Sequence, residues 1–195
     1  WNLFPDTLDD DGKPEGWAFR KIRDYLDLAY GKSLPQKQRK FGKYPVYGSG
    51  GIAGFHTQCL VEGPVIIVGR KGTVGSVYWE ERSAFPIDTV FYAVPKVPSS
   101  YFCYHILRSL PLSKMNTDAA VPGLNRNNVY RLNFPWAGQK LIECFDALAK
   151  PLFERQRTNE AENITLAETR DLLLPKLMSG EISVGEFENH IGGAA

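Results

Sequence analysis

The chain has 195 residues, enough for one hydrophobic core or for one domain with an appendage. It is 43% hydrophobic and 23% charged with a formal net charge of +1, an ordinary globular composition. No apolar run approaches the roughly 18 residues of a membrane helix, and the N-terminus lacks the basic start and apolar centre of a signal peptide. The cysteines, Cys59, Cys103 and Cys144, are odd in number and far apart, so we expect free thiols in the cytoplasm.

The net charge conceals an uneven distribution. Residues 17–138 hold 16 Lys and Arg against 7 Asp and Glu, which is +9, whereas residues 1–16 and 139–195 each carry −4. A basic body between acidic ends is typical of a nucleic-acid reader with a protein-facing tail, although charge alone equally allows a solvated basic face. The chain does not begin with methionine, so we expect a processed product or a fragment.

The polar composition of residues 1–16 predicts a linker. From Trp17 to about Pro135, short apolar runs of β type recur, each bounded by Gly or Pro, at 65–68, 76–79 and 89–94. The run at 65–68 is continuous, which predicts a buried central strand. Residues 21–30 and 99–110 have helical spacing. These segments predict an α+β domain with a twisted β-sheet and small helices.

From Ala137 to about Ser179 the pattern changes to one long helix of roughly 40 residues, or roughly 60 Å if straight, with Gly180 as its C-cap. Apolar residues share one 3-4 register along it: Ile142, Phe145, Ala149, Leu152, Leu166, Leu173 and Leu177. Such a helix needs a partner in antiparallel or coiled-coil contact. Folding back on its own domain is disfavoured, because a body of about 120 residues is only near 30 Å across.

Several catalytic interpretations fail on spacing. The loop Gly69-Arg-Lys-Gly-Thr-Val-Gly75 is not a P-loop, and Ser49 does not sit in G-x-S-x-G. Cys103 and His105 resemble half of a metal site, but no second pair stands at ligand spacing. Asn133-Phe-Pro-Trp136 faintly resembles the Asn-Pro-Pro-Tyr motif of adenine methyltransferases, yet no glycine-rich loop follows a strand at a suitable distance upstream to hold S-adenosylmethionine. We therefore expect no catalysis, no cofactor and no metal.

Two glycine-rich loops and one polar segment carry groups suited to binding. The stretch 43–55 packs four glycines between aromatic residues, and 69–75 places Arg70 and Lys71 between glycines. Backbone amides, hydroxyls and cations suit a phosphodiester backbone, and Arg can also fork onto guanine. The segment 115–128 contains Asn side chains that can pair with adenine edges, although capping a short helix is the simpler role for any one of them.

Taken in order, these pieces resemble the DNA-specificity (S) subunit of Type I restriction–modification systems. The resemblance covers nearly the whole chain and lies in Phe4-Pro-Asp-Thr, Pro14-Glu-Gly-Trp17, Gly31-Lys-Ser-Leu-Pro35, Tyr44-Pro-Val-Tyr-Gly-Ser-Gly-Gly51, Ile66-Ile-Val-Gly-Arg-Lys-Gly-Thr-Val-Gly75, Ala119-Ala-Val-Pro-Gly-Leu-Asn125 and Leu172-Leu-Leu-Pro-Lys-Leu-Met-Ser-Gly-Glu-Ile182. No single piece is specific, and the order of the pieces carries the resemblance.

The resemblance implies a non-catalytic subunit with two target recognition domains and two long conserved helices that pair antiparallel. Each domain reads one half of a split double-stranded DNA target, and methyltransferase and restriction subunits assemble on the S subunit. This chain has one domain and one helix, which is expected of a C-terminal half or of a half-subunit that dimerises. A C2 homodimer would read a palindromic split site. The implied division is a recognition domain at 1–136, a spacer and dimerisation helix at 137–180, and a tail at 181–195.

DNA contacts are expected from basic and polar residues of the loops: Lys32, Ser33, Lys37, Arg39, Lys40, Tyr47, Ser49, Arg70, Lys71, Thr73, Asn125, Arg126 and Asn127. Partner and dimer contacts are expected from Ile142, Phe145, Leu152, Leu166, Leu173 and Leu177. Two other classes stay open. One is the recognition domain of a fused methyltransferase–endonuclease, and the other is a helical assembly adaptor that does not bind DNA.

Overall fold

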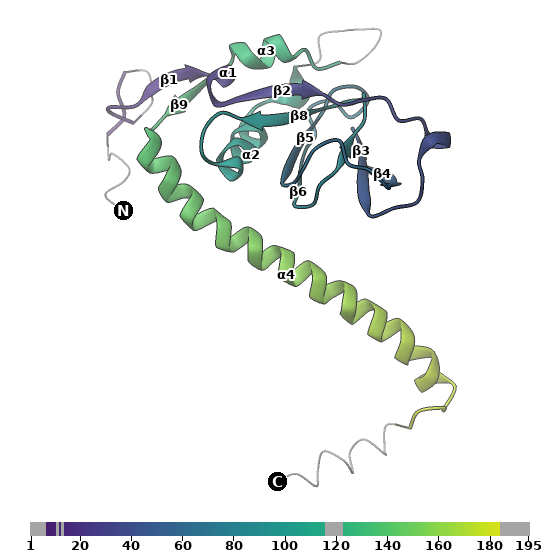
Figure 1. Cartoon of the computed structure of the whole chain (residues 1–195). Helices are drawn as coiled ribbons and strands as arrows, with labels where there is room; N and C mark the ends of the chain where they lie inside the picture. The colour runs from purple at the N-terminus through teal and green to yellow at the C-terminus, as the bar shows by residue number, and fades with distance from the viewer. Residues whose placement is uncertain (1–6, 11, 13, 116–122, 184–195) are drawn as a thin grey trace, which may run out of the picture. The chain divides into compact units, whose positions relative to one another are not determined.

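A computed structural model describes residues 7–10, 12, 14–115 and 123–183 (Figure 1). Two of the segments that carry the family resemblance, 4–7 and 119–125, lie mostly outside the described residues. The same holds for most of the tail predicted at 181–195. The chain divides into two units, Trp1–Ala147 and Leu148–Ala195, and each is described by itself. The first unit contains the α+β domain that the sequence predicts, and the second contains most of the long helix.

The described residues form small sheets with short helices beside them. In chain order the elements are β1 (Ala18–Lys21), α1 (Ile22–Tyr25), β2 (Leu26–Tyr30), the 3-10 helix η1 (Gln36–Gln38), β3 (Tyr44–Gly48), β4 (Gly51–His56), β5 (Val65–Gly69), β6 (Val77–Glu80), β7 (Phe85–Pro86), β8 (Val90–Pro95), α2 (Ser100–Ser109), the 3-10 helix η2 (Leu112–Lys114), α3 (Arg126–Arg131), β9 (Asn133–Trp136) and α4 (Gln139–Met178). Their sheet orders are β2-β8-β5-β6, β4-β3-β7 and β1-β9.

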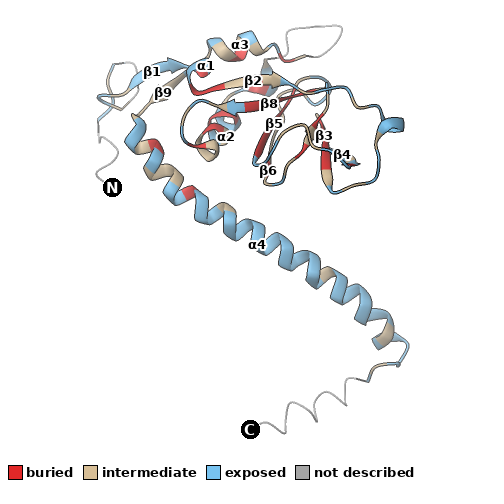
Figure 2. Cartoon of the chain, viewed as in Figure 1, coloured by how far each residue is buried: buried red, intermediate tan, exposed pale blue. Residues whose placement is uncertain are grey.

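The strand β5 lies inside the four-stranded sheet, and all five of its residues are buried (Figure 2). Successive strand residues point to opposite faces, so each face of β5 meets a different core. Ile66 packs in the larger cluster, which includes Ile106 of α2. Ile67 packs in a smaller cluster with Tyr47 of β3. The continuous apolar run at 65–68 is thereby confirmed as a buried central strand.

The two predicted short helices have different outcomes. The helix at 99–110 is confirmed as α2, whose N-cap Ser99 accepts a hydrogen bond from the Phe102 N–H at 3.0 Å. The helix expected over 21–30 is wrong beyond its first turn, because residues 26–30 form β2 and pair antiparallel with β8. Leu26 and Leu28 are buried at the two-residue period of a strand, and pairing with β8 overrides the helical spacing.

The helix α4 confirms the long helix that the sequence predicts. It has 40 residues and continues through Pro151 and Pro175. Gly180 has φ 75°, in the left-handed region that favours glycine, and its N–H donates to the Leu177 carbonyl oxygen at 3.2 Å. The Ile182 N–H donates to the Lys176 carbonyl oxygen at 3.2 Å, so the last turn closes with a glycine cap.

The first turns of α4 belong to the first unit. Ile142 is 1% exposed, and the Phe145 ring packs edge-on against Phe102 with centroids 5.6 Å apart. The Ser99 hydroxyl donates to the Asp146 carboxylate at 2.5 Å. Ile142 is therefore a core residue of the first unit and is not available for the partner contact predicted for it, whereas Phe145 is partly buried and packs against Phe102.

Candidate nucleic-acid interface

The structure brings the two glycine loops together through Ser49. Its hydroxyl accepts a hydrogen bond from the Thr73 N–H at 3.4 Å, and its carbonyl oxygen accepts one from the Ser76 hydroxyl at 2.8 Å. Gly72 has φ 77°, and a Cβ there would lie 3.0 Å from the Ser49 Oγ. The β3–β4 turn and the 69–75 loop therefore form one continuous surface, as their shared character suggests.

The segment that begins α3 lies beside the second glycine loop. The Leu124 N–H donates to the Arg70 carbonyl oxygen at 2.8 Å. The guanidinium groups of Arg70 and Arg126 lie over the ring of Tyr30, at 5.3 and 4.9 Å from its centroid. We call Tyr30, Arg70 and Arg126 the Tyr30 cluster. Tyr30 is half-exposed and was not among the residues that the sequence singled out.

Backbone carbonyls fix both arginines of the Tyr30 cluster. The Nη2 of Arg70 donates to the Asp88 carbonyl oxygen at 2.6 Å. The Nη1 of Arg126 donates to the Leu28 carbonyl oxygen at 3.3 Å. A guanidinium carries five donors in a rigid fork, so these bonds orient the group without using its full donor set. Two cations are thus held in place near an aromatic ring at the surface.

The loop at 31–43 has five Lys and Arg and no Asp or Glu. Arg39 holds this loop in place, because its Nε donates to the Leu34 carbonyl oxygen at 3.2 Å and its Nη1 to the Ala53 carbonyl oxygen of β4 at 2.7 Å. Arg39 is partly exposed, and its predicted contact with DNA stays a prediction. The other predicted residues of the loop are exposed and stay candidates: Lys32, Ser33, Lys37 and Lys40.

Tyr47 was also predicted to contact DNA, and the structure removes it from the surface. It is 6% exposed, and its hydroxyl donates to the Glu80 carboxylate at 3.0 Å. The Nε of Arg82 donates to the same carboxylate at 2.8 Å. Burial raises the pKa of the Tyr47 hydroxyl, and the Glu80 charge adds to this. Burial by itself raises the pKa of Glu80, but hydrogen bonds from Arg82 and Tyr47 outweigh it, so the pKa lies below its usual range.

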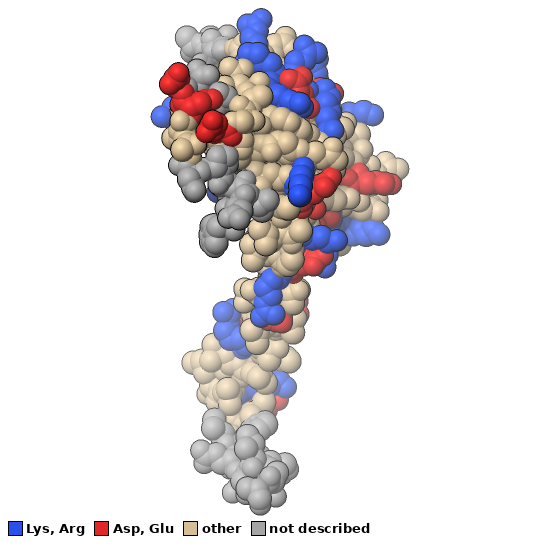
Figure 3. Space-filling model, turned by 90° about the vertical axis from the view of Figure 1, so that its left-hand side faces the viewer, with Lys and Arg blue, Asp and Glu red and all other residues tan. Residues whose placement is uncertain are grey.

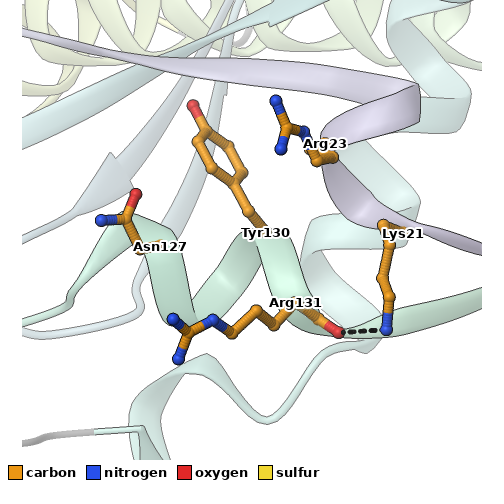
Figure 4. Close-up of a pocket in the computed structure, with 5 residues that line it drawn as sticks. All are labelled: Lys21, Arg23, Asn127, Tyr130 and Arg131. Atoms are coloured by element: carbon orange, nitrogen blue, oxygen red, sulfur yellow. Dashed lines mark hydrogen bonds between the residues drawn. The ribbon is translucent and has the colours of Figure 1, made fainter.

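The three predicted residues at the start of α3 have three different positions. Asn125 is the N-cap, and its side-chain oxygen accepts a hydrogen bond from the Asn127 N–H at 2.9 Å, which confirms the capping interpretation. Arg126 lies in the Tyr30 cluster. The Asn127 side chain lines a separate hollow of about 340 Å³ (Figure 4), which we call the α3 hollow; its other lining residues are Lys21, Arg23, Tyr130 and Arg131.

Three cations surround the α3 hollow, and the sequence did not single them out. The Lys21 ammonium donates to the Arg131 carbonyl oxygen at 3.2 Å, which ties the end of β1 to the end of α3. The Tyr130 hydroxyl accepts a hydrogen bond from the Leu28 N–H at 2.8 Å, so its ring has a fixed position. Figure 3 shows Lys and Arg side chains gathered at the upper end of the face it presents, at the height of α1 and α3 in Figure 1.

Other kinds of site were also considered. Among the residues that the structure describes, no group of three or more His, Cys, Asp and Glu could hold a metal ion. The Cys103 thiol is buried, and burial raises its pKa to about 12, which keeps it protonated. A protonated thiol is a poor metal ligand and a poor nucleophile. None of the described helices is long and apolar enough to cross a membrane.

Two curated proteins are similar to this chain. The Type I restriction enzyme HindI specificity subunit of Haemophilus influenzae is 26% identical over an alignment of 199 positions, which covers 87% of this chain and 42% of that protein. The MjaIX specificity subunit of Methanocaldococcus jannaschii is 25% identical over an alignment of 218 positions, which covers 95% of this chain and 48% of that protein. The chain therefore spans about half the length of the curated relatives it matches.

Solved structures share the fold. The Type I restriction–modification S subunit from M. genitalium superposes with a TM-score of 0.72 at 19% identity, over 89% of this chain and 48% of that one. The HsdS subunit from Thermoanaerobacter tengcongensis gives a TM-score of 0.53 at 16% identity, over 93% of this chain and 49% of that one. A protein-family model described as the Type I restriction modification DNA specificity domain matches residues 14–135 of the sequence. This match covers more than half of the chain, so the chain belongs to the family of Type I restriction–modification DNA-specificity proteins.

Proposed function

We propose that this chain is a non-catalytic DNA-specificity element that reads one half of a split double-stranded target for a Type I restriction–modification system. The observation that carries the proposal is the meeting of the two glycine loops and the start of α3 on one surface that presents fixed cations. Family membership supports it independently. The similar proteins are specificity subunits, so neither a helical adaptor that ignores DNA nor the recognition part of a fused enzyme is favoured.

Sequence-independent affinity comes from cations that neutralise phosphates. Lys32, Lys37, Lys40 and Lys71 are exposed on the loops that flank the Tyr30 cluster. Each phosphate contact releases a condensed counterion, so affinity falls as salt rises. The α3 hollow adds Lys21, Arg23 and Arg131 as a second group of phosphate contacts. These contacts position the duplex and carry no sequence information.

Sequence discrimination comes from a smaller set of oriented side chains. In this proposal the unused N–H donors of Arg70 and Arg126 face base edges. The hydrogen bonds from each guanidinium to a backbone carbonyl oxygen fix its orientation, so the unused donors point in a limited range of directions. Asn127, the next residue of α3, is exposed and lines the α3 hollow, where its amide can pair with a base edge. Ser49 and Thr73 are placed at the glycine loops, where hydroxyls can contact phosphate or base. Each good bidentate pair discriminates by about 1–3 kcal/mol.

The helix α4 supplies the assembly contacts in this proposal. Beyond residue 147, it exposes leucines on its predicted stripe, with Leu152 at 71%, Leu166 at 65%, and Leu173 and Leu177 at about 40%. Such a stripe is buried when a second long helix pairs with it. We assign that second helix to another copy of the chain or to the other half of an S subunit. Methyltransferase subunits, and then restriction subunits, would join this pair in the cytoplasm.

This assignment keeps the division proposed from the sequence, with recognition at 1–136, spacing and dimerisation at 137–180 and a tail at 181–195. The packing of Ile142 adds one refinement, because residues 139–147 also complete the core of the recognition unit. The helix therefore has a structural part at its start and an assembly part beyond residue 147.

A titration with a labelled 30-base-pair duplex of random sequence tests the DNA-binding part. If all seven of the proposed cations contact phosphates, affinity should fall by about three to four orders of magnitude between 50 and 200 mM salt. Selection of bound duplexes from a random library tests the specificity part, and a short fixed motif should be enriched. Affinity that does not respond to salt, or binding without enrichment, would contradict the proposal.

A further inference from the structure

The loop at 31–43 exposes an unusual side chain among its cations. Phe41 is 98% exposed, the highest value for a large hydrophobic residue in the described part of the chain. A single exposed hydrophobic residue is ordinary and requires no explanation by itself. The surroundings of Phe41 distinguish it, because the loop is tethered on both sides of the ring and carries charge of one sign.

Both neighbours of Phe41 lie against the end of β4. The Lys40 N–H donates to the His56 Nδ1 at 3.1 Å. A Cβ at Gly42 would lie 2.4 Å from the His56 carbonyl oxygen, so the loop approaches β4 closely there. Arg39 adds its bond to the Ala53 carbonyl oxygen at 2.7 Å. The backbone around Phe41 is therefore fixed, and the ring is held away from the domain.

The charge of the loop indicates what covers this ring. Lysines stand at positions 32, 37, 40 and 43 with Arg39, and the loop contains no acidic residue. Two such loops would repel each other, which excludes a second copy of the same loop as the occupant. The partner must combine negative charge with an apolar surface. Duplex DNA does so, because its phosphates flank grooves lined by base edges and thymine methyl groups.

We propose that Phe41 enters a groove of duplex DNA and contacts the bases, while Lys40 and Lys43 bind phosphates beside it. The inference rests on the proposed function and adds a reading residue that is apolar rather than hydrogen-bonding. Apolar side chains, Phe among them, insert against base steps in other DNA-binding proteins and deform them. Such a contact depends on sequence through the stacking and shape of the step.

The test uses the whole chain and two duplex pools, one random and one selected by the unmodified chain. Phe41→Ala should bind the selected pool about ten- to a hundred-fold more weakly, the range expected for losing a buried Phe, with its salt slope unchanged. Lys40→Ala is the matched control. It should weaken binding to both pools and reduce the salt slope by about 0.9. The melting temperature of Phe41→Ala should match that of the unmodified chain, because the side chain is exposed.

Phe41→Trp gives a direct readout, since stacking on bases quenches indole emission. Phe41→Trp emits more than the unmodified chain because of its additional indole, and the duplex should quench this additional emission. Anionic phosphatidylserine vesicles should leave it unchanged, because a membrane is the other surface with charge and apolar groups. The inference is overturned if Phe41→Ala binds the selected pool within twofold of the unmodified chain, or if vesicles quench the added emission of the Phe41→Trp variant and duplex does not. Failure to select any pool would overturn the proposed function together with this inference.

Discussion

Tyr47→Phe should destabilise the protein and leave its DNA affinity unchanged. The substitution removes the hydroxyl that donates to the Glu80 carboxylate at 3.0 Å in a site where Tyr47 is 6% exposed and Glu80 is 7% exposed. The ring remains, so packing against Ile67 and Val65 is kept. The variant therefore isolates one buried hydrogen bond to a charged group.

The expected loss of stability depends on the hydrogen bonds that Glu80 keeps in the variant. A hydrogen bond to a charged group contributes about 1.5–3 kcal/mol. Glu80 keeps bonds from the Arg82 Nε at 2.8 Å and Nη2 at 3.1 Å, so its charge is not left unpaired. The cost should lie near the lower end, at about 1.5 kcal/mol. For a chain of this size that lowers the melting temperature by about 3–6 °C.

The assay is thermal unfolding followed by circular dichroism, paired with a duplex titration at fixed salt. Tyr44→Phe is the matched control, because Tyr44 lies on the same strand and is only partly buried. It should change the melting temperature by less than about 1 °C. The reasoning is refuted if Tyr47→Phe melts within about 1 °C of the unmodified chain, or if it loses DNA affinity while the melting temperature is preserved.

Three other perturbations test separate parts of the account. Stability should fall as the pH drops below about 4.5, because the pKa of Glu80 is lower in the folded state than in the unfolded state. Protonation of Glu80 then removes the stabilisation that its charge provides. Glu80→Gln should flatten that decline in a series of melting temperatures measured from pH 7 to 3.5. Residues 1–147 should melt at least about 3 °C above residues 1–137, because the shorter chain loses the buried Ile142, and equal melting would contradict the packing of α4 described above. Arg131→Glu should weaken random-duplex binding and reduce the salt slope by about one, whereas Arg155→Glu on α4 should do neither.

Strong local signals made part of the fold predictable. The strand β5 is a continuous apolar run, which few structures other than a buried strand accommodate. The helix α4 repeats one register over 40 residues and ends at a glycine. The strand β2 was missed because it is short, and because Ile22, Tyr25 and Leu26 have the i, i+3, i+4 spacing of a helix. Pairing with β8, about 65 residues further on, decided between them.

The candidate site was only partly predictable for the same reason. The ordered motifs located both glycine loops and the start of α3, but they could not show that these segments touch through Ser49 and Leu124. Lys21 and Arg131 come together because β1 pairs with β9, which places Lys21 opposite Asn133 and lets its ammonium reach the Arg131 carbonyl oxygen, 110 residues further along the chain. The sequence around Tyr47 suggested an exposed aromatic residue beside a loop. In the structure Tyr47 is buried, and its hydroxyl donates to Glu80, 33 residues away. Contacts between distant residues decided each of these positions.

The central claim is that this chain sets the DNA specificity of a modification system. A base-resolution methylation map of a strain that carries the gene, compared with a strain in which only this segment is deleted, tests that claim most directly. Expression of the methyltransferase genes is verified in both strains. The account predicts that one split motif loses its methylation on deletion and that returning the segment restores it. An unchanged methylation map with the methyltransferase expressed would contradict the account.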